Sequence, residues 1–134
     1  MEKLIDQFVQ NVNDGVQISD IEGNIRYMNP VAKERLGISG DISNVNVRDF
    51  EPIFENQEMW DDHIRMLREQ GFQTIRSNNV NLITQVETSV EVTVFIKAVE
   101  GEEYVFAISR DIEKVLETEK RLELREKMLK AIAD

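Results

Sequence analysis

Cysteine is absent from this chain of 134 residues, and histidine occurs only once. The lack of cysteine excludes disulfides, thiolate metal ligands and thiol nucleophiles. A metal cluster that needs a second histidine is excluded as well. No segment approaches the roughly 18 apolar residues of a membrane-spanning helix, and the N-terminus has no apolar signal run. We therefore expect a cytoplasmic segment that makes no contact with a membrane.

Positive charge is also scarce, with 16 basic against 26 acidic residues, a net charge of -10 and a pI of about 4.6. Nucleic acids and anionic membrane surfaces repel such a chain, so we expect no nucleic-acid partner. Hydrophobic residues make up 41% of the chain and charged residues 31%. At this length, that balance predicts one folded domain with room for a long additional helix.

The C-terminal tail contains no glycine or proline and is rich in strong helix formers. Val115, Leu122 and Leu129 recur every seven residues, which is typical of a short parallel coiled coil. Glu119 and Glu126 occupy the alternate seam positions, so such a coil would be weak in isolation. The alternative is a helix that packs on its own domain. We interpret the tail as a helical connector.

The N-terminal part predicts a helix followed by a hairpin. Residues 16–29 read as two short strands around the turn Asp20–Gly23, where Gly23 supplies the positive φ that the turn needs. Residues 3–12 read as a short amphipathic helix with its apolar side chains on one face. These side chains are Leu4, Ile5, Phe8 and Val12.

The middle of the chain predicts two helices. The pair Asn29-Pro30 is a helix start, because asparagine caps free amides and proline suits the first turn. This helix ends at Gly37, and a second one runs from about Met59 to Gln70. Residues 40–58 are irregular and carry apolar side chains that we expect to fold over a core.

Three strands follow, at residues 72–77, 89–99 and 103–112. The second strand alternates in polarity, which places its valines on one face. The third is apolar on both faces, although an antiparallel strand with one wet face should alternate. Both of its faces must therefore be covered, one by the helices and the other by an added helix or a second chain. One face of the third strand holds Val105 and Ala107, and the other holds Tyr104, Phe106 and Ile108.

The order of these elements, with two local sequences, resembles a PAS (sensory box) domain of a microbial signal-transduction protein. The first sequence is DGVQISDIEGNIRYMNPVAKERLG, from Asp14 to Gly37, which is similar to the opening of the family. The second is SVEVTVFIKAVEGEEYVFAISRDIEK, from Ser89 to Lys114, which is similar to its closing hairpin and Arg-Asp-Ile exit. The resemblance covers roughly residues 4–114.

The resemblance implies an α+β fold: a five-stranded antiparallel sheet with helices on one face, an N-terminal amphipathic helix and a C-terminal signalling helix. It divides the chain into a cap helix at 1–13, a sensor domain at 14–112 and a coiled-coil-like connector at 113–134. Glu113 stands where the family often has threonine, so the polar linkage at the domain exit is open. Residues 77–88 lack the family's usual Lys-Asp-Gly turn, so that loop is atypical.

The function that the resemblance implies is sensing. Such domains bind a small ligand or cofactor in a cavity and relay its state through the C-terminal helix to a covalently linked effector, such as a histidine kinase or a cyclic-dinucleotide enzyme. The alternative is a ligand-free dimerisation or scaffold module. The valines could wall a cavity or simply pack a core. The candidate cavity residues are Ile64, Leu67, Val90, Val92, Val94, Val105, Ala107 and Ser109.

The cofactor is unknown from the sequence. Haem-binding members of the family use a histidine on the corresponding helix, but matching the helix registers places that ligand nearer Trp60 than His63. We therefore favour a surface or partly buried imidazole at His63. A cysteinyl flavin is excluded because the chain has no cysteine, and a noncovalent flavin is left open without support.

Catalysis by this chain is not expected. It has no glycine-rich phosphate loop and no nucleophile elbow. Residues 111–134 contain no histidine that could accept a phosphoryl group. Any kinase or cyclase must therefore lie outside this chain.

A homodimer is expected from the apolar outer face of the sheet. One short N-terminal helix does not cover a whole sheet face, so a second copy should share it, with the tail helices side by side. Such a dimer should be weak, because the charged seam positions interrupt the coil. The residues expected to form this surface are Leu4, Ile5, Phe8, Val12, Phe95, Phe106 and Ile108.

Overall fold

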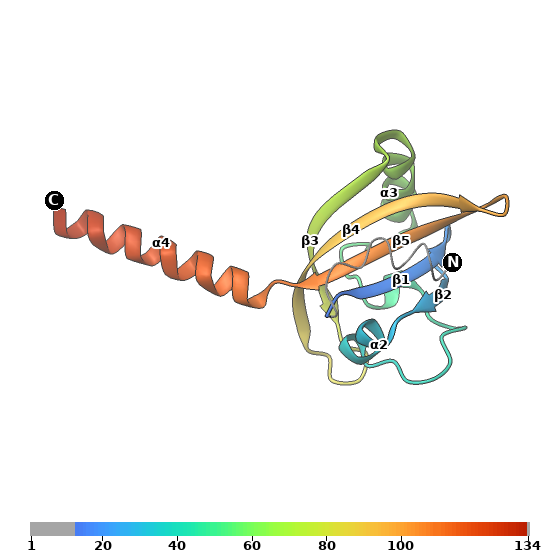
Figure 1. Ribbon diagram of the computed structural model, residues 1–134, viewed down its shortest axis with the longest axis horizontal. Helices are drawn as coiled ribbons and strands as arrows, with labels where there is room; N and C mark the ends of the chain where they lie inside the picture. Colours follow the sequence, from blue (N-terminus) through green and yellow to red (C-terminus); the bar gives the residue numbers. More distant parts are fainter. Residues whose placement is uncertain (1–12, 134) are drawn as a thin grey trace.

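A computed structural model describes residues 13–133, and Figure 1 shows how the elements are arranged. Five strands form one antiparallel sheet in the order β2-β1-β5-β4-β3. The expected α+β fold is thus confirmed. The helix expected from Leu4, Ile5, Phe8 and Val12 lies outside the described residues. The elements are β1 (Gly15–Asp20), β2 (Ile25–Met28), α2 (Pro30–Leu36), the 3-10 helix η1 (Val47–Asp49), α3 (Gln57–Gln70), β3 (Phe72–Val80), β4 (Glu87–Val99), β5 (Glu102–Asp111) and α4 (Glu113–Ala133).

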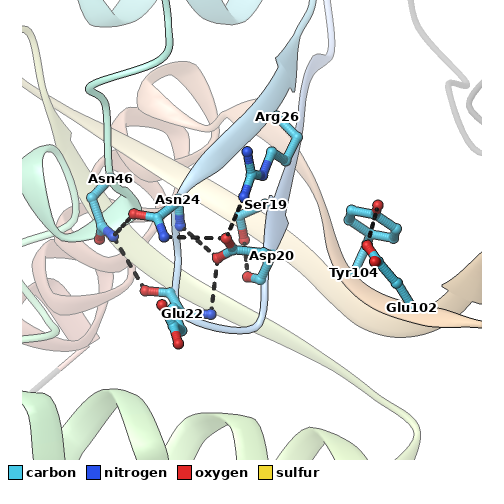
Figure 2. A network of polar contacts seen from close by, with 8 residues as sticks. All are labelled: Ser19, Asp20, Glu22, Asn24, Arg26, Asn46, Glu102 and Tyr104. Atoms are coloured by element: carbon cyan, nitrogen blue, oxygen red, sulfur yellow. Dashed lines mark hydrogen bonds and ion pairs between the residues drawn. The ribbon is translucent and has the colours of Figure 1, made fainter.

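The turn between β1 and β2 is held by the carboxylate of Asp20 (Figure 2). Asp20 accepts hydrogen bonds from the backbone amides of Glu22 and Asn24 at 3.0 and 2.9 Å. It also forms an ion pair with Arg26 at 3.0 Å. Partial burial opposes ionisation, but these hydrogen bonds lower the pKa of Asp20 below its usual value. Gly23 has a φ of 90°, as the sequence predicts.

Helix α2 begins and ends where the sequence predicts. The Asn29 side chain accepts a hydrogen bond from the amide of Ala32 at 2.9 Å, and Pro30 occupies the first turn. Gly37 ends the helix in the left-handed conformation, with a φ of 70°. The Asn29 side chain also accepts a hydrogen bond from the amide of Val16 at 3.0 Å, which fixes α2 against β1.

Helix α3 begins at Gln57, slightly earlier than the predicted Met59. The reason is the Asn56 side chain, which accepts a hydrogen bond from the amide of Met59 at 2.9 Å and so caps the first turn. The helix ends before Gly71, as predicted. Its buried side chains are Trp60, His63, Ile64 and Leu67.

The strands β3 and β4 extend further into their connecting loop than predicted. β3 runs to Val80, where the sequence suggested an end at Ser77. Serine and asparagine disfavour strands, but here they pair with β4 through residues 87–90. The turn from β4 to β5 lies at Glu100 and Gly101, which both have positive φ, as a type I′ hairpin requires.

Each face of the sheet carries a buried apolar cluster, as the pattern of β5 predicts. α2, α3 and the segment around η1 contribute to the main core on the inner face, which contains Phe50 and Trp60. On the outer face, Val16, Ile18 and Phe106 form a second buried cluster. The inner side chains of the closing strands are Val90, Val92, Val94, Val105 and Ala107.

Helix α4 extends away from the sheet as one long helix (Figure 1). Among its described residues, no side chain is buried. Val115, Leu122 and Leu129 are 45%, 58% and 57% exposed, so the seven-residue seam faces solvent. Within residues 13–133, no helix has the length and apolar character needed to span a membrane.

Candidate functional site

A small cavity lies between the inner face of the sheet and the segment that leads from η1 into α3. Val92 and Val94 of β4 and Val105 and Ala107 of β5 form its sheet wall, and these four were expected there from the sequence. The rest of the wall is formed by Gln17, Ser19, Val47, Glu51, Phe54, Trp60, His63 and Ile75.

Glu51 is the most unusual group in this wall, because it is acidic and only 5% exposed. The Ser77 hydroxyl donates a hydrogen bond to its carboxylate at 2.8 Å, and the Asn79 amide donates to the other oxygen. Burial raises the pKa of Glu51 to about 7, although these two hydrogen bonds lower it. The carboxyl is therefore near the midpoint of its titration at neutral pH.

His63 faces the cavity between two aromatic rings. Its ring centre lies 4.8 Å from that of Phe54 and 5.6 Å from that of Trp60. The side chain is 8% exposed, whereas the sequence favoured a surface or partly buried imidazole. That expectation failed because α3 packs this part of its surface, together with Trp60, against the body of the domain.

The imidazole of His63 has no hydrogen-bond partner among residues 13–133. Burial lowers its pKa below the usual value for histidine, so the ring is neutral at pH 7. A neutral imidazole carries one donor and one acceptor nitrogen. The cavity wall thus contains a hydrogen-bonding group that makes no bond to another described residue and can bond to water.

The cavity is small. The space open to the centre of a water molecule is about 20 Å³, and about 10–15 Å³ of such space holds one water. A haem or a flavin needs far more room, so the residues around His63 do not fit either cofactor in this arrangement. Among residues 13–133, no group of three or more His, Cys, Asp or Glu side chains is placed to hold a metal ion.

The other expected cavity residues are not part of its wall. Leu67 and Val90 are buried in the main core, and Ile64 lines a separate groove on the surface. Ser109 accepts a hydrogen bond from the guanidinium of Arg35 at 2.9 Å. On α3, Trp60 and His63 line the cavity in place of Ile64 and Leu67, because the helix turns that part of its buried face toward the sheet.

The outer-face residues lie together on the opposite side of the sheet. The rings of Phe95 and Phe106 stack with centroids 5.2 Å apart and an interplanar angle of 5°. Phe95 and Ile108 pack, partly buried, against the cluster of Val16, Ile18 and Phe106. This surface is apolar and separate from the cavity.

Polar contacts at the domain exit attach α4 to the two strands β4 and β3. The amide of Ser89 donates a hydrogen bond to the Glu113 carboxylate at 2.8 Å. The Ser89 carbonyl accepts one from the amide of Ile112 at 3.0 Å. Further along the helix, Arg76 donates to both carboxylate oxygens of Glu119, at 3.2 and 3.3 Å. Glu113 therefore supplies the polar linkage at the exit.

Sequence reasoning missed Glu51 as a site residue. One signal for its burial was present in the sequence. The apolar residues Val47, Phe50 and Phe54 flank Glu51 and indicate that this irregular segment packs against the core. Its partners Ser77 and Asn79 alternate along β3, which gives them a common face. Nothing in the local sequence connects the two segments.

Comparison with protein-family models matches residues 3–70 to a family described as the PAS domain. A comparison with curated protein sequences finds no match.

Solved structures of PAS domains share the fold. The PAS domain of an HTR-like protein from Haloarcula marismortui is 21% identical, with a TM-score of 0.69 over 83% of this chain and 91% of that one. A domain of the sensory box sensor histidine kinase/response regulator from Geobacter sulfurreducens is 14% identical, with a TM-score of 0.65 over 82% and 93%. The PAS domain of nitrogen regulation protein NR(II) from Vibrio parahaemolyticus is 19% identical, with a TM-score of 0.58 over 81% and 98%.

Proposed function

The chain belongs to the PAS domain family, and from this premise we propose that it is a sensory domain. The cavity on the inner face of the sheet receives the stimulus, a small ligand in the most general form. The state of the cavity changes the direction of α4, and α4 passes that change to an effector outside this chain. We propose no catalytic role for the chain itself, and its cytoplasmic location stays a prediction.

One observation carries this proposal: the strands that wall the cavity are the strands to which α4 is attached. Val92 and Val94 of β4 line the cavity, and Ser89 of the same strand holds the start of α4 through Glu113. β3 contributes Ile75 to the cavity wall. A change in the cavity that shifts either strand therefore acts directly on the attachment of α4.

The effector class is proposed from the structural relatives. One solved neighbour is a PAS domain from a two-component sensor histidine kinase, and another comes from a sensory box sensor histidine kinase/response regulator. On these relatives we propose a covalently linked histidine kinase as the receiver of the α4 signal; a cyclic-dinucleotide enzyme, which the sequence resemblance implies, is the alternative receiver.

A cavity-filling substitution tests the proposal. Ala107→Val adds two methyl groups to a wall that has room for about one water, so the strands around it must move apart. Because the chain has no cysteine, spin labels can be attached only to introduced cysteines, at the exposed positions Lys97 and Arg125. We expect pulsed electron paramagnetic resonance to show a shifted distance between the labels.

The matched control is Ala98→Val, which places the same two methyl groups at an exposed position of β4. It should leave the label distance unchanged. If Ala107→Val leaves the protein folded by circular dichroism and the distance also unchanged, the cavity does not control α4 and the sensory proposal is wrong.

The second candidate function is a ligand-free dimerisation module, with a homodimer as the partner. Two observations favour it: the exposed seam of Val115, Leu122 and Leu129 on α4, and the apolar cluster around Phe106 on the outer face. Sedimentation should then find a concentration-dependent dimer whose α4 direction does not respond to the cavity. A dimer that does respond would combine both functions.

A further inference from the structure

The strand β3 links the cavity to α4 through side chains on its two faces. Ser77 and Asn79 on the inner face donate their hydrogen bonds to Glu51. Arg76, the residue beside Ser77, binds both carboxylate oxygens of Glu119 on α4. Neighbouring residues of a strand point to opposite faces, so one short piece of β3 contacts the buried carboxyl and the exit helix.

The backbone strengthens this connection. The amide of Val80 donates a hydrogen bond to the carbonyl of Phe50 at 3.0 Å, next to Glu51 in the sequence. β3 is also the last strand in the sheet order and pairs only with β4. A displacement of the segment around Glu51 is therefore transmitted to a strand that, among residues 13–133, is paired along a single edge.

Protonation of Glu51 changes what this carboxyl can bind. The ionised form accepts hydrogen bonds only, and Ser77 and Asn79 on β3 supply them. The protonated form has an O–H donor, which needs an acceptor. His63 and Gln17 line the same cavity and have no hydrogen-bond partner among residues 13–133. The two forms thus favour different partners, one set on β3 and one set in the cavity.

Near pH 7, Glu51 is the group at the cavity whose charge changes, as the surrounding titratable groups show. The other titratable side chain that lines the cavity, within the described range, is His63 on α3, and burial keeps it neutral. In the η1 segment, Arg48 bonds to the Gln57 side chain at 3.1 Å, and Asp49 accepts a hydrogen bond from the amide of Asn46.

The adjoining strands add no charged group to the cavity wall. Arg76 of β3 lies 3.9 Å from Glu91 of β4, and both side chains are on the outer face, 49% and 37% exposed. β1 contributes uncharged Gln17 and Ser19, and the β5 residues that face the cavity are apolar.

We propose that the stimulus of this domain is the proton. Gain or loss of the Glu51 proton exchanges hydrogen bonds between β3 and the cavity, and Arg76 and Glu119 carry the exchange to α4. This inference rests on the proposed sensory function, because it names the stimulus for the same cavity. The size of the cavity agrees with it, since the space is that of about one water and a proton needs no more room.

The test follows the label distance between Lys97→Cys and Arg125→Cys from pH 5.5 to 8.5, with the whole chain. We expect two distance populations whose ratio changes with a midpoint near pH 7. In the same range, the side-chain carboxyl carbon of Glu51 should titrate by nuclear magnetic resonance. Glu51→Gln should lock the distance in one population at every pH, because glutamine does not titrate.

A second variant separates the sensor from the transmission. Arg76→Gln should leave the Glu51 titration in place but abolish the pH-dependent change in distance. The matched control is Arg65→Gln, which removes an arginine that pairs with Asp62 on the exposed side of α3 and should keep the full change.

Failure of the proton proposal can be told from failure of the sensory function. If Ala107→Val moves α4 but pH does not, the domain senses the state of its cavity and the proton is the wrong stimulus. If neither moves α4, both proposals are wrong. A pH-dependent distance that persists in Glu51→Gln, or an added mass on the folded protein in native mass spectrometry, also overturns the proton assignment.

Discussion

The body of the domain and the exit helix α4 are held by different kinds of interaction. The body buries large side chains such as Trp60, Phe50 and Leu36, each at most 2% exposed. Helix α4, over its described length, buries none and is attached by polar contacts such as the one between Arg76 and Glu119. Exposed ion pairs contribute about 0–1 kcal/mol each. The direction of α4 can therefore change at an energy that leaves the body folded.

The largest expected effect comes from breaking the body. Trp60→Ala should lower the free energy of unfolding by about 3–5 kcal/mol, because it leaves a large hole in the main core. It also removes the indole hydrogen bond to the carbonyl of Ile21. Trp60 is the only tryptophan, so urea unfolding should be followed by circular dichroism. The neighbouring, exposed Met59→Ala is the control and should change stability by less than about 0.5 kcal/mol.

The next effect concerns a charge inside the body. The pKa of Glu51 rises from 4.5 to about 7 on folding, and one pKa unit corresponds to about 1.4 kcal/mol. Because the folded state holds this proton more tightly, the stability of the unchanged chain falls as the pH rises from about 4.5 to about 7. Between pH 4.5 and pH 8, the free energy of unfolding of Glu51→Gln should therefore rise by about 3 kcal/mol relative to that of the unchanged chain. Urea unfolding at each pH measures this difference.

His63 acts in the opposite direction on stability. Its pKa is lowered in the folded state, so stability is lost as the pH falls below the usual value of about 6.5. The unchanged chain and the Glu51→Gln variant both keep His63, so its effect cancels when their free energies of unfolding are subtracted. Glu55→Gln, an exposed change in the same segment, should follow the unchanged chain at each pH. If the stability of Glu51→Gln had the same pH dependence as that of the unchanged chain, Glu51 would not be buried as an ionisable carboxyl.

A smaller effect is expected from the seam of α4. Leu122→Glu should weaken a homodimer at least tenfold, because burial of one leucine is worth about 1.5–3 kcal/mol. Stability of the body should stay within about 0.5 kcal/mol, since the side chain is 58% exposed. The control is Leu124→Glu, equally exposed but off the seam. Sedimentation that finds the two variants equally dimeric would rule out the seam as the interface.

The smallest effect on stability is expected at the attachment of α4. Arg76→Gln should change the free energy of unfolding by about 0–1 kcal/mol, because Arg76 and Glu119 are 49% and 51% exposed. The label distance between Lys97→Cys and Arg125→Cys should nevertheless become broader. In the unchanged chain, 1 M salt should broaden it in part, since salt screens exposed charges over about 3 Å. A distribution insensitive to both changes would mean that other contacts orient α4.

The sequence was informative wherever the deciding contacts are local. The alternation of Val90, Val92 and Val94 is a property of one strand, and the cap at Asn29 acts on an amide three residues away. The turn at Gly23 likewise depends on its positive φ and on Asp20, three residues earlier. Strand faces, helix ends and turns could therefore be predicted before any tertiary contact was known.

The polar part of the candidate site could not be predicted in this way. Glu51 is buried next to Ser77 and Asn79, which are 26 and 28 residues away in the chain. Whether His63 or Ile64 faces the cavity depends on how α3 rotates against the sheet, and both residues lie on its buried face. Such features follow from tertiary packing, which overrides the local pattern.

The pairing of β1 with β5 also decides when the domain can fold during its synthesis. Gly15 pairs with Ser109, 94 residues later in the chain. At a synthesis rate of about 5–20 residues per second, β1 waits roughly 5–20 s for its partner strand. During that time Val16 and Ile18 have no Phe106 to pack against, so the nascent chain exposes apolar side chains and an unpaired strand edge that chaperones can bind. Closure by such a distant strand also favours folding in milliseconds to seconds rather than microseconds.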